Sequence, residues 1–238
     1  MAKIISFCSQ KGGVGKTSIT THVATYYYQV EGIPVTVFDC DYPQHSLNSI
    51  RESEIQRLKS DESYYKKAER LGKMPYPIYS DSLINTLPKL DSFNKKNELV
   101  LVDLPGTLNV DGFPGMVKRL DAAILLIEAD PISFESTMHT VLAMASFDNK
   151  NGGMVPTYLL WNKYDIRVRE DRYANLEQAA ITYLEGLNKD RKTPINVKFL
   201  KYRIPQSVNI QDYRSTLIPH RTIEPLVHEL NKTLVSNS

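Results

Sequence analysis

The chain has 238 residues, of which 42% are hydrophobic and 24% are charged, and its formal net charge is +2 at pH 7. It can therefore build one substantial core, but no stretch approaches the roughly twenty apolar residues that a membrane-spanning helix needs. The near-neutral charge does not in itself indicate a nucleic-acid binder, and no charged leader with an apolar core precedes the first strand-like run, so we expect a cytoplasmic protein with no membrane partner.

Apolar, strand-like runs alternate with helix-like segments along the chain. This alternation predicts the α/β class, with a mainly parallel, twisted sheet, helices on both of its faces and a single domain over residues 1–238. The segment 51–79 is the exception, because it is polar and mixes both signs of charge. We expect a peripheral helix plus a loop there, either plainly solvated or bearing on partner choice. The strand-like runs lie at 3–8, 34–39, 98–104, 121–128, 154–161 and 195–204.

A glycine-rich loop separates the first strand-like run from a helix expected over 18–30. The loop reads Q-K-G-G-V-G-K-T over residues 10–17, so the phosphate-loop pattern G-x-x-x-x-G-K-[ST] fails only at Gln10. Its glycines let successive backbone N–H groups face a polyphosphate, and the start of the following helix adds to the attraction. The alternative is a glycine turn with incidental lysines. The residues expected to hold a nucleotide here are Gly12, Gly13, Val14, Gly15, Lys16, Thr17 and Ser18.

In a loop of this kind, Lys16 reaches the β- and γ-phosphates and the hydroxyl of Thr17 binds Mg²⁺. The expected architecture is then the three-layer P-loop NTPase fold. The stretch K-G-G-V-G-K-T from Lys11 to Thr17 closely resembles the deviant P-loop of the ParA/MinD family of ATPases, which act in partition and positioning. The resemblance implies ATP and Mg²⁺ as ligands and a homodimer on ATP binding. It also makes Lys11 a second catalytic lysine beside Lys16, reaching the phosphates of the partner protomer.

Two further segments are similar to motifs of that family. The sequence D-C-D-Y-P-Q at 39–44 resembles the family's D-x-D-P-Q, with Tyr42 inserted before the proline. The resemblance implies that Asp41 is catalytic and positions or deprotonates the attacking water, and that Asp39 supports the magnesium shell. Asp103 closes the apolar run at 99–103 and takes the magnesium-side Walker B position, so the implied metal residues are Thr17, Asp39 and Asp103. Taken alone, an Asp-rich turn after a strand is also ordinary turn chemistry.

The stretch 159–165 bears on whether the bound nucleotide carries adenine or guanine. It contains N-K-x-D from Asn162 to Asp165, a pattern that reads guanine in many GTPases, yet it also aligns with the family's T-x-Y-D segment. Downstream, Y-R-I-P-Q at 202–206 resembles the family's I-P-R segment, whose loop packs on adenine. We therefore expect Asn162 and Pro205 at the base of ATP, with a GTP-dependent switch protein as the alternative.

Positive charge gathers in the segment 189–221, which has eight lysines and arginines against two acids, Asp190 and Asp212. Such a surface can neutralise DNA phosphates without reading sequence, or it can be plain solvated surface. Together with the first reading, the resemblance to the ParA/MinD family implies a ParA-type ATPase of plasmid, chromosome or mobile-element partitioning, with nonspecific DNA binding and a ParB-like or other activating partner. The alternative is a conjugation-accessory or protein-cargo-positioning ATPase. The basic residues are Lys189, Arg191, Lys192, Lys198, Lys201, Arg203, Arg214 and Arg221.

Overall fold

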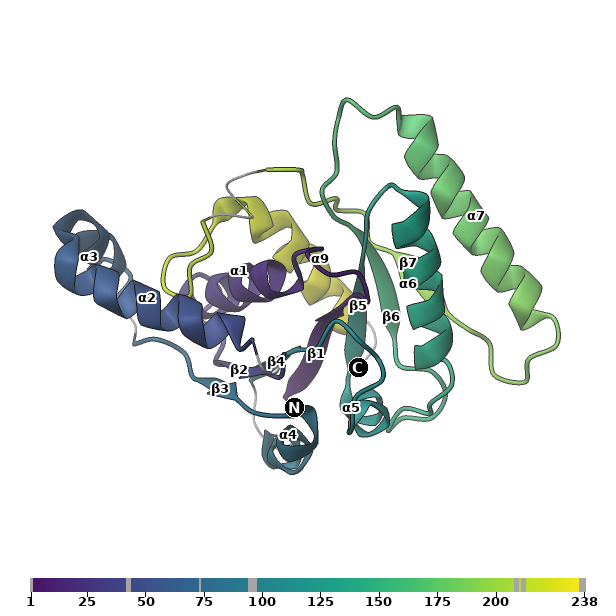
Figure 1. Ribbon diagram of the computed structural model, residues 1–238, viewed down its shortest axis with the longest axis horizontal. Helices are drawn as coiled ribbons and strands as arrows, with labels where there is room; N and C mark the ends of the chain where they lie inside the picture. The colour runs from purple at the N-terminus through teal and green to yellow at the C-terminus, as the bar shows by residue number, and fades with distance from the viewer. Residues whose placement is uncertain are drawn as a thin grey trace.

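A seven-stranded sheet forms the centre of the molecule, with every pair of neighbouring strands parallel (Figure 1). The computed structural model describes residues 2–41, 44–72, 74–93, 98–207, 210 and 213–235. The strand order is β3-β2-β4-β1-β5-β6-β7. The strands are β1 (Lys3–Cys8), β2 (Val35–Asp39), β3 (Ile78–Ser80), β4 (Leu99–Asp103), β5 (Ala122–Ile127), β6 (Thr157–Trp161) and β7 (Val197–Phe199).

Helices cover both faces of this sheet, which gives three layers. On one face lie α1 and α9, and on the other lie α4, α5, α6 and α7. The helices are α1 (Lys16–Gln29), α2 (Ser46–Ser60), α3 (Glu62–Glu69), α4 (Leu83–Leu90), α5 (Phe113–Arg119), α6 (Pro131–Met144), α7 (Glu170–Asn188) and α9 (Glu224–Val235), with 3₁₀ turns at Asp91–Phe93 and Arg221–Ile223. This confirms the predicted α/β P-loop fold with a parallel sheet.

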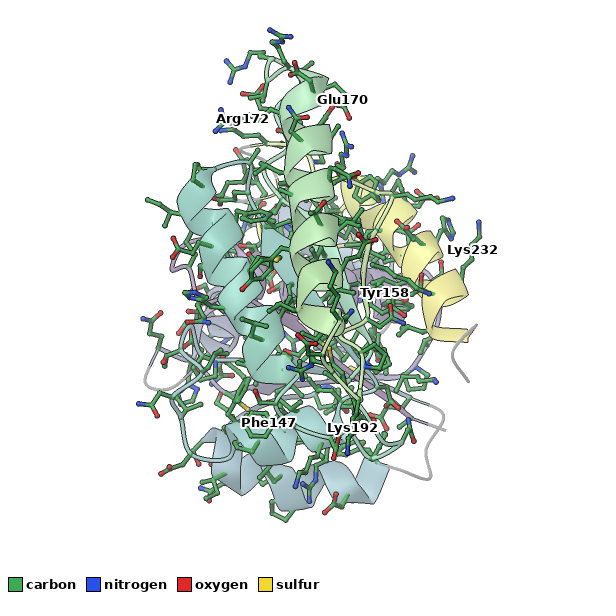
Figure 2. The ribbon with its side chains drawn as sticks, turned by 90° about the vertical axis from the view of Figure 1, so that its right-hand side faces the viewer. Phe147, Tyr158, Glu170, Arg172, Lys192 and Lys232 are labelled. Atoms are coloured by element: carbon green, nitrogen blue, oxygen red, sulfur yellow. The ribbon has the colours of Figure 1, made fainter. Side chains whose placement is uncertain are left out.

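The central strands are apolar on both sides because both of their faces are buried. In β4, Leu99 and Leu101 pack with α1 and α9, whereas Val100 and Val102 pack with the opposite helices. Side chains alternate between the faces of a strand, so one continuous apolar run supplies two cores. Figure 2 shows α6 and α7 in the outer layer, with Glu170 at one end of α7 and Lys192 beyond its other end.

The parallel arrangement brings polar and charged side chains together at one edge of the sheet, because the carboxyl ends of all the strands lie there. Asp39 and Asp103 end the neighbouring strands β2 and β4 and face each other in register. The glycine-rich loop follows β1 at the same edge, and Glu128 and Asn162 follow β5 and β6. Segments far apart in the sequence therefore supply a single site.

Three sequence expectations on element bounds are corrected. The edge strand β3 was not expected, since only three residues form it. The run at 154–161 forms a strand only from Thr157, after Pro156, which has no N–H to donate to the ladder. The run at 195–204 is a strand only over Val197–Phe199. The amide of Leu200 still donates to the carbonyl of Leu159 (2.8 Å), but those of Lys201 and Tyr202 turn to the carboxylate of Glu229 (2.7 and 2.8 Å).

The polar segment 51–79 contains more structure than the expected helix and loop. It holds most of α2, all of α3 and the start of β3, and the two helices project at the edge of the molecule (Figure 1). Glu54 of α2 is buried and accepts from the hydroxyl groups of Tyr64 and Ser215 and from the amide of Thr216 (2.7 Å). The helical hairpin is therefore fastened to the segment that follows residue 213.

Candidate functional site

The loop after β1 has the geometry of an anion cradle. Gly13 and Gly15 have φ values of +71° and +94°, which a residue with a Cβ adopts only with strain. Gly15 is the N-cap of α1, and no side chain in the described part of the chain caps that helix. The first amides of α1 therefore remain available to a phosphate, with the positive end of the helix dipole behind them.

A cavity of about 330 Å³ opens over this loop, within the size range of small-ligand sites. Most residues predicted from sequence to hold a nucleotide line it, whereas Lys11, Gly12, Asp39 and Asp103 are outside its lining. Gln44, Ser46, Lys163, Ile210 and Arg214 are lining residues that the sequence did not indicate. The cavity is lined by Gly13, Val14, Gly15, Lys16, Thr17, Ser18, Ile19, Asp41, Gln44, Ser46, Asn162, Lys163, Pro205, Ile210 and Arg214.

Thr17 and Asp103 meet beneath the cavity, although they are 86 residues apart. The hydroxyl of Thr17 donates to Oδ2 of Asp103 at 2.6 Å. Burial, with the nearby charge of Asp39 as a smaller contribution, raises the pKa of Asp103 to about 7. Lys16 is buried, and a Cβ at Gly106 would lie only 3.5 Å from its Nζ, so the segment after Asp103 passes directly beside the lysine.

The oxygen atoms at this point fit a hard divalent cation. Oδ1 of Asp39 and Oδ1 of Asp103 are buried and have no hydrogen-bond partner among the described residues. Together with the hydroxyl of Thr17 they form an all-oxygen donor set, which Mg²⁺ prefers. In the described ranges, no group of three or more His, Cys, Asp and Glu side chains is arranged to hold a metal alone. A cation here would need phosphate or water oxygens as well.

Asp39 and Asp41 have different surroundings. Asp39 is fully buried, and its Oδ2 accepts from the amides of Leu47 (3.0 Å) and Asn48 (3.4 Å) at the start of α2. It therefore fixes α2 to the end of β2, a structural role that the sequence did not reveal. Asp41 lies on the wall of the cavity. The inserted residue Tyr42 lies outside the described residues.

The N-K-x-D stretch is split between two environments. Asn162 is buried, and its amide nitrogen donates to the carbonyl of Val14. Asp165 is outside the cavity lining, and Arg167 contacts both of its oxygens (2.9 and 2.7 Å), which lowers the pKa of Asp165 to about 2. Asn162, the first residue of the guanine-reading pattern, therefore lies at the cavity. Asp165, the last residue of the pattern, lies outside the cavity lining and is paired with Arg167.

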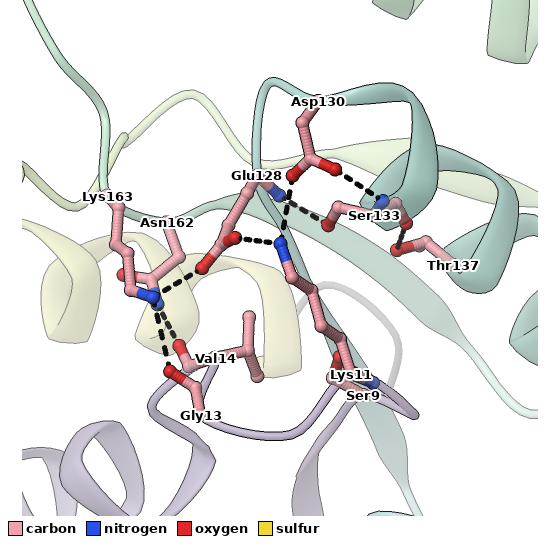
Figure 3. Close-up of polar contacts among 10 residues, drawn as sticks. All are labelled: Ser9, Lys11, Gly13, Val14, Glu128, Asp130, Ser133, Thr137, Asn162 and Lys163. Carbon is pink, nitrogen blue, oxygen red and sulfur yellow. Dashed lines mark hydrogen bonds and ion pairs between the residues drawn. The ribbon is translucent and has the colours of Figure 1, made fainter.

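Lys11 lies beside the cavity in a cluster of charged groups (Figure 3). Its ammonium contacts Glu128 and also Oδ2 of Asp130 at 3.0 Å. The hydrogen bond to Glu128 is the main cause that raises the pKa of Lys11 above its ordinary value. Sequence reasoning missed both acids, yet their position just after the apolar residues 122–127 was a usable signal, because strand ends meet at this edge.

Two of the basic residues of 189–221 belong to other features of the structure. Arg203 is bonded to Glu170 (2.6 Å) and Glu177 (3.4 Å), and Arg214 lines the cavity. Lys192 lies beyond the opposite end of α7 from Glu170 (Figure 2). Asp212 falls outside the described residues. Arg203 is therefore paired with acids and Arg214 adjoins the cavity, while binding of DNA by this segment stays a prediction.

No helix in the described part of the chain has both the length and the apolar character that crossing a bilayer demands.

Comparisons with known proteins agree with the fold and the loop. The family described as the CobQ/CobB/MinD/ParA nucleotide binding domain matches residues 5–218. The comparison with curated proteins found no match.

Three similar solved structures belong to partition and division proteins. A plasmid partition protein from Borrelia burgdorferi bound to AMPPNP has 16% identity and a TM-score of 0.59 over 100% of both chains. The MinC:MinD cell division complex from Aquifex aeolicus has 18% identity and a TM-score of 0.60, covering 99% of this chain and 96% of that one. The pNOB8 ParA bound to nonspecific DNA has 20% identity and a TM-score of 0.58 over 100% of both. At these identities the likeness shows the fold.

Gly15→Ala should reduce the free energy of unfolding by about 1–2 kcal/mol, because the residue must keep a left-handed conformation. The new Cβ would also lie 3.4 Å from Nδ2 of Asn162. Gly12→Ala is the matched control, since no heavy atom lies within 4 Å of its added Cβ. We expect a change within about 0.5 kcal/mol for it. Urea unfolding measures both; equal effects would contradict the strain at Gly15.

Proposed function

Because this chain belongs to the CobQ/CobB/MinD/ParA family of nucleotide-binding domains, we propose that it is an ATPase of ParA type that dimerises on ATP binding and acts in the partition of plasmid, chromosome or mobile-element DNA. The observation that carries the proposal is the cavity over the glycine-rich loop, with Lys16 in its wall and the Thr17–Asp103 contact beneath it. A similar structure bound to AMPPNP supports the choice of an adenine nucleotide.

The residues divide the work of binding. The amides at the start of α1 and the ammonium of Lys16 hold the phosphates, while Thr17 and Asp103, supported by Asp39, hold Mg²⁺. When bound, Mg²⁺ supplies positive charge that neutralises the phosphate oxygens. The oxygens of Asp39 and Asp103 that accept no hydrogen bond support this assignment. Gly106 beside Lys16 gives the segment after β4 direct access to the phosphate end of the ligand.

Hydrolysis needs an oriented water and a stabilised transition state. Asp41, on the cavity wall, orients the attacking water and accepts its proton. Lys11 of one protomer reaches the phosphates of its partner and stabilises the charge that develops there, as an arginine finger does. A monomer alone therefore binds nucleotide but hydrolyses it slowly.

The nature of the base is the next question, and we favour adenine. Asp165, which would have to accept from guanine, is held by Arg167 outside the cavity lining. Pro205 and Ile210 instead offer apolar surface in the cavity wall. Displacement of a fluorescent ATP analogue by unlabelled ATP and GTP tests this choice; displacement by GTP at lower concentration than by ATP would replace the ATPase with a GTP-dependent switch.

A cargo-positioning or conjugation-accessory ATPase remains the second candidate. The pairing of Arg203 with Glu170 and Glu177 favours it, because this arginine is then less available to DNA phosphates. The projecting α2–α3 hairpin offers a surface for a protein partner instead. A pNOB8 ParA, in turn, forms a complex with nonspecific DNA, which supports the partition function.

Lys16→Ala should weaken binding of Mg-ATP by at least about a hundredfold, because hydrogen bonds from a charged group to phosphate are lost. Thr17→Ala should weaken it only when Mg²⁺ is present, since the hydroxyl acts through the metal. Isothermal titration measures both, with the exposed Lys118→Ala as control. Wild-type affinity in the Lys16 variant would refute the assignment of the phosphate site.

Lys11→Ala and Asp41→Ala should have opposite phenotypes. The Lys11 variant should bind Mg-ATP yet stay monomeric and inactive, because its charge acts on the partner's phosphates. The Asp41 variant should form the dimer and accumulate in it, because the water is no longer oriented. Light scattering with Mg-ATP and a phosphate-release assay measure these properties. Normal turnover by the Asp41 variant would assign the water to another group.

If the ATP form binds DNA, the exposed lysines Lys198 and Lys201 are better candidates for the contacts than Arg203 and Arg214. Lys198→Glu with Lys201→Glu should weaken binding of the ATP form to nonspecific DNA and reduce the slope of log K against log salt by about 2. The control is Lys66→Glu with Lys118→Glu, which changes the net charge equally. Fluorescence anisotropy at about 50 mM salt measures DNA binding by these variants. A wild type without affinity for DNA at that salt concentration would favour the cargo-positioning function.

A further inference from the structure

Glu128 and Asp130, the two acids that contact Lys11, are each held in place through one carboxylate oxygen. The other oxygen of each contacts the lysine. Oε1 of Glu128 pairs with Nζ of Lys163 at 2.7 Å, while Oε2 contacts Lys11. Oδ1 of Asp130 accepts from the amide of Ser133 at 2.9 Å, while Oδ2 accepts from Lys11 at 3.0 Å. The pair therefore forms an acidic receptacle, defined here as the carboxylates of Glu128 and Asp130.

The receptacle does not depend on Lys11 for its shape. Lys163 also donates to the carbonyl of Gly13 at 3.1 Å, so Glu128 is linked to the phosphate loop. The hydroxyl of Ser133 accepts from the amide of Glu128 at 2.9 Å, and Asp130 caps α6 (Figure 3). Because these contacts remain when Lys11 leaves, the nearly buried Glu128 keeps a positive partner and its charge stays compensated.

We propose that Glu128 and Asp130 are positioning residues that hold Lys11 within its own protomer and thereby oppose formation of the nucleotide-sandwich dimer. The inference rests on the proposed function, since it concerns the lysine that acts on the partner's phosphates. One ammonium group cannot contact both sites, so each dimer that forms must release two lysines from two receptacles. The receptacle thus sets the concentration of ATP-bound protein at which dimers appear.

Glu128→Gln with Asp130→Asn removes both charges and keeps the shape. The amide oxygens of these side chains can still accept from Lys163 and from the amide of Ser133. With Mg-ATP, the double variant should dimerise at about tenfold lower protein concentration than the wild type, since partly exposed ion pairs of modest strength are lost twice per dimer. Asp130→Asn alone, which leaves the Lys163–Glu128 pair intact, should shift the midpoint by a smaller factor in the same direction.

A second measurement reads the position of Lys11 without any nucleotide. The rate of amine-selective modification of Lys11, followed by peptide mass spectrometry, should rise several-fold in the double variant because the ammonium is no longer held. The matched control is Asp81→Asn, which frees Lys89 from its partner at 2.6 Å. It should accelerate modification of Lys89 and leave the rate at Lys11 unchanged.

The outcomes separate this inference from the proposed function. Equal modification of Lys11 in wild type and double variant shows that the acids do not hold the lysine, and overturns the inference. Faster modification with an unchanged dimerisation midpoint overturns the regulatory role. A wild type that binds no Mg-ATP overturns the proposed function and the regulatory role with it, while the modification rates still decide where Lys11 is held.

Discussion

Two carboxylates buried side by side constrain everything at the carboxyl edge of the sheet. Asp39 and Asp103 are register partners at the ends of β2 and β4, and both side chains are fully buried. Two negative charges at such a place are costly unless each finds hydrogen-bond donors or a cation. Thr17 satisfies one oxygen of Asp103, and the first amides of α2 satisfy one oxygen of Asp39. The remaining two oxygens are what a divalent cation would bind.

This constraint links the ligand to the rest of the molecule. Asp39 has one oxygen without a hydrogen bond beside Asp103 and fixes the start of α2 with the other. Further along α2, Glu54 is bonded to Ser215 and Thr216, next to the segment that places Arg214 in the cavity wall. Binding of a cation between Asp39 and Asp103 would therefore act on α2. Both contacts that anchor this helix, at its first amides and at Glu54, lie next to the cavity.

The sequence predicted the parts of the site that depend on local patterns. The glycine spacing predicted the phosphate loop, because only residues without a Cβ suit the positive φ values of Gly13 and Gly15. The apolar runs predicted the parallel sheet, whereas Asp39 and Asp103 were assigned to one site only through the resemblance to the family; the structure places them as register partners. The contacts of Arg203 and Arg214 could not be predicted, because they depend on which side chains lie opposite one another after folding. A count of basic residues along 189–221 does not distinguish Arg203, half-enclosed by acids and tyrosine rings, from the exposed Lys198.

The two edge strands also limit how copies of the chain can associate. Both β3 and β7 have only three residues, so the sheet ends in a short strand on each side within the described part of the chain, and Lys198 adds a charged side chain to one of them. Short or charged edges are poor templates for strand addition. Continuation of the sheet from one copy into the next is therefore disfavoured at both ends. The loops at the carboxyl edge differ from these edge strands, because their backbone amides and charged side chains do not belong to a ladder. They are therefore the surface best suited to association of two copies of the chain.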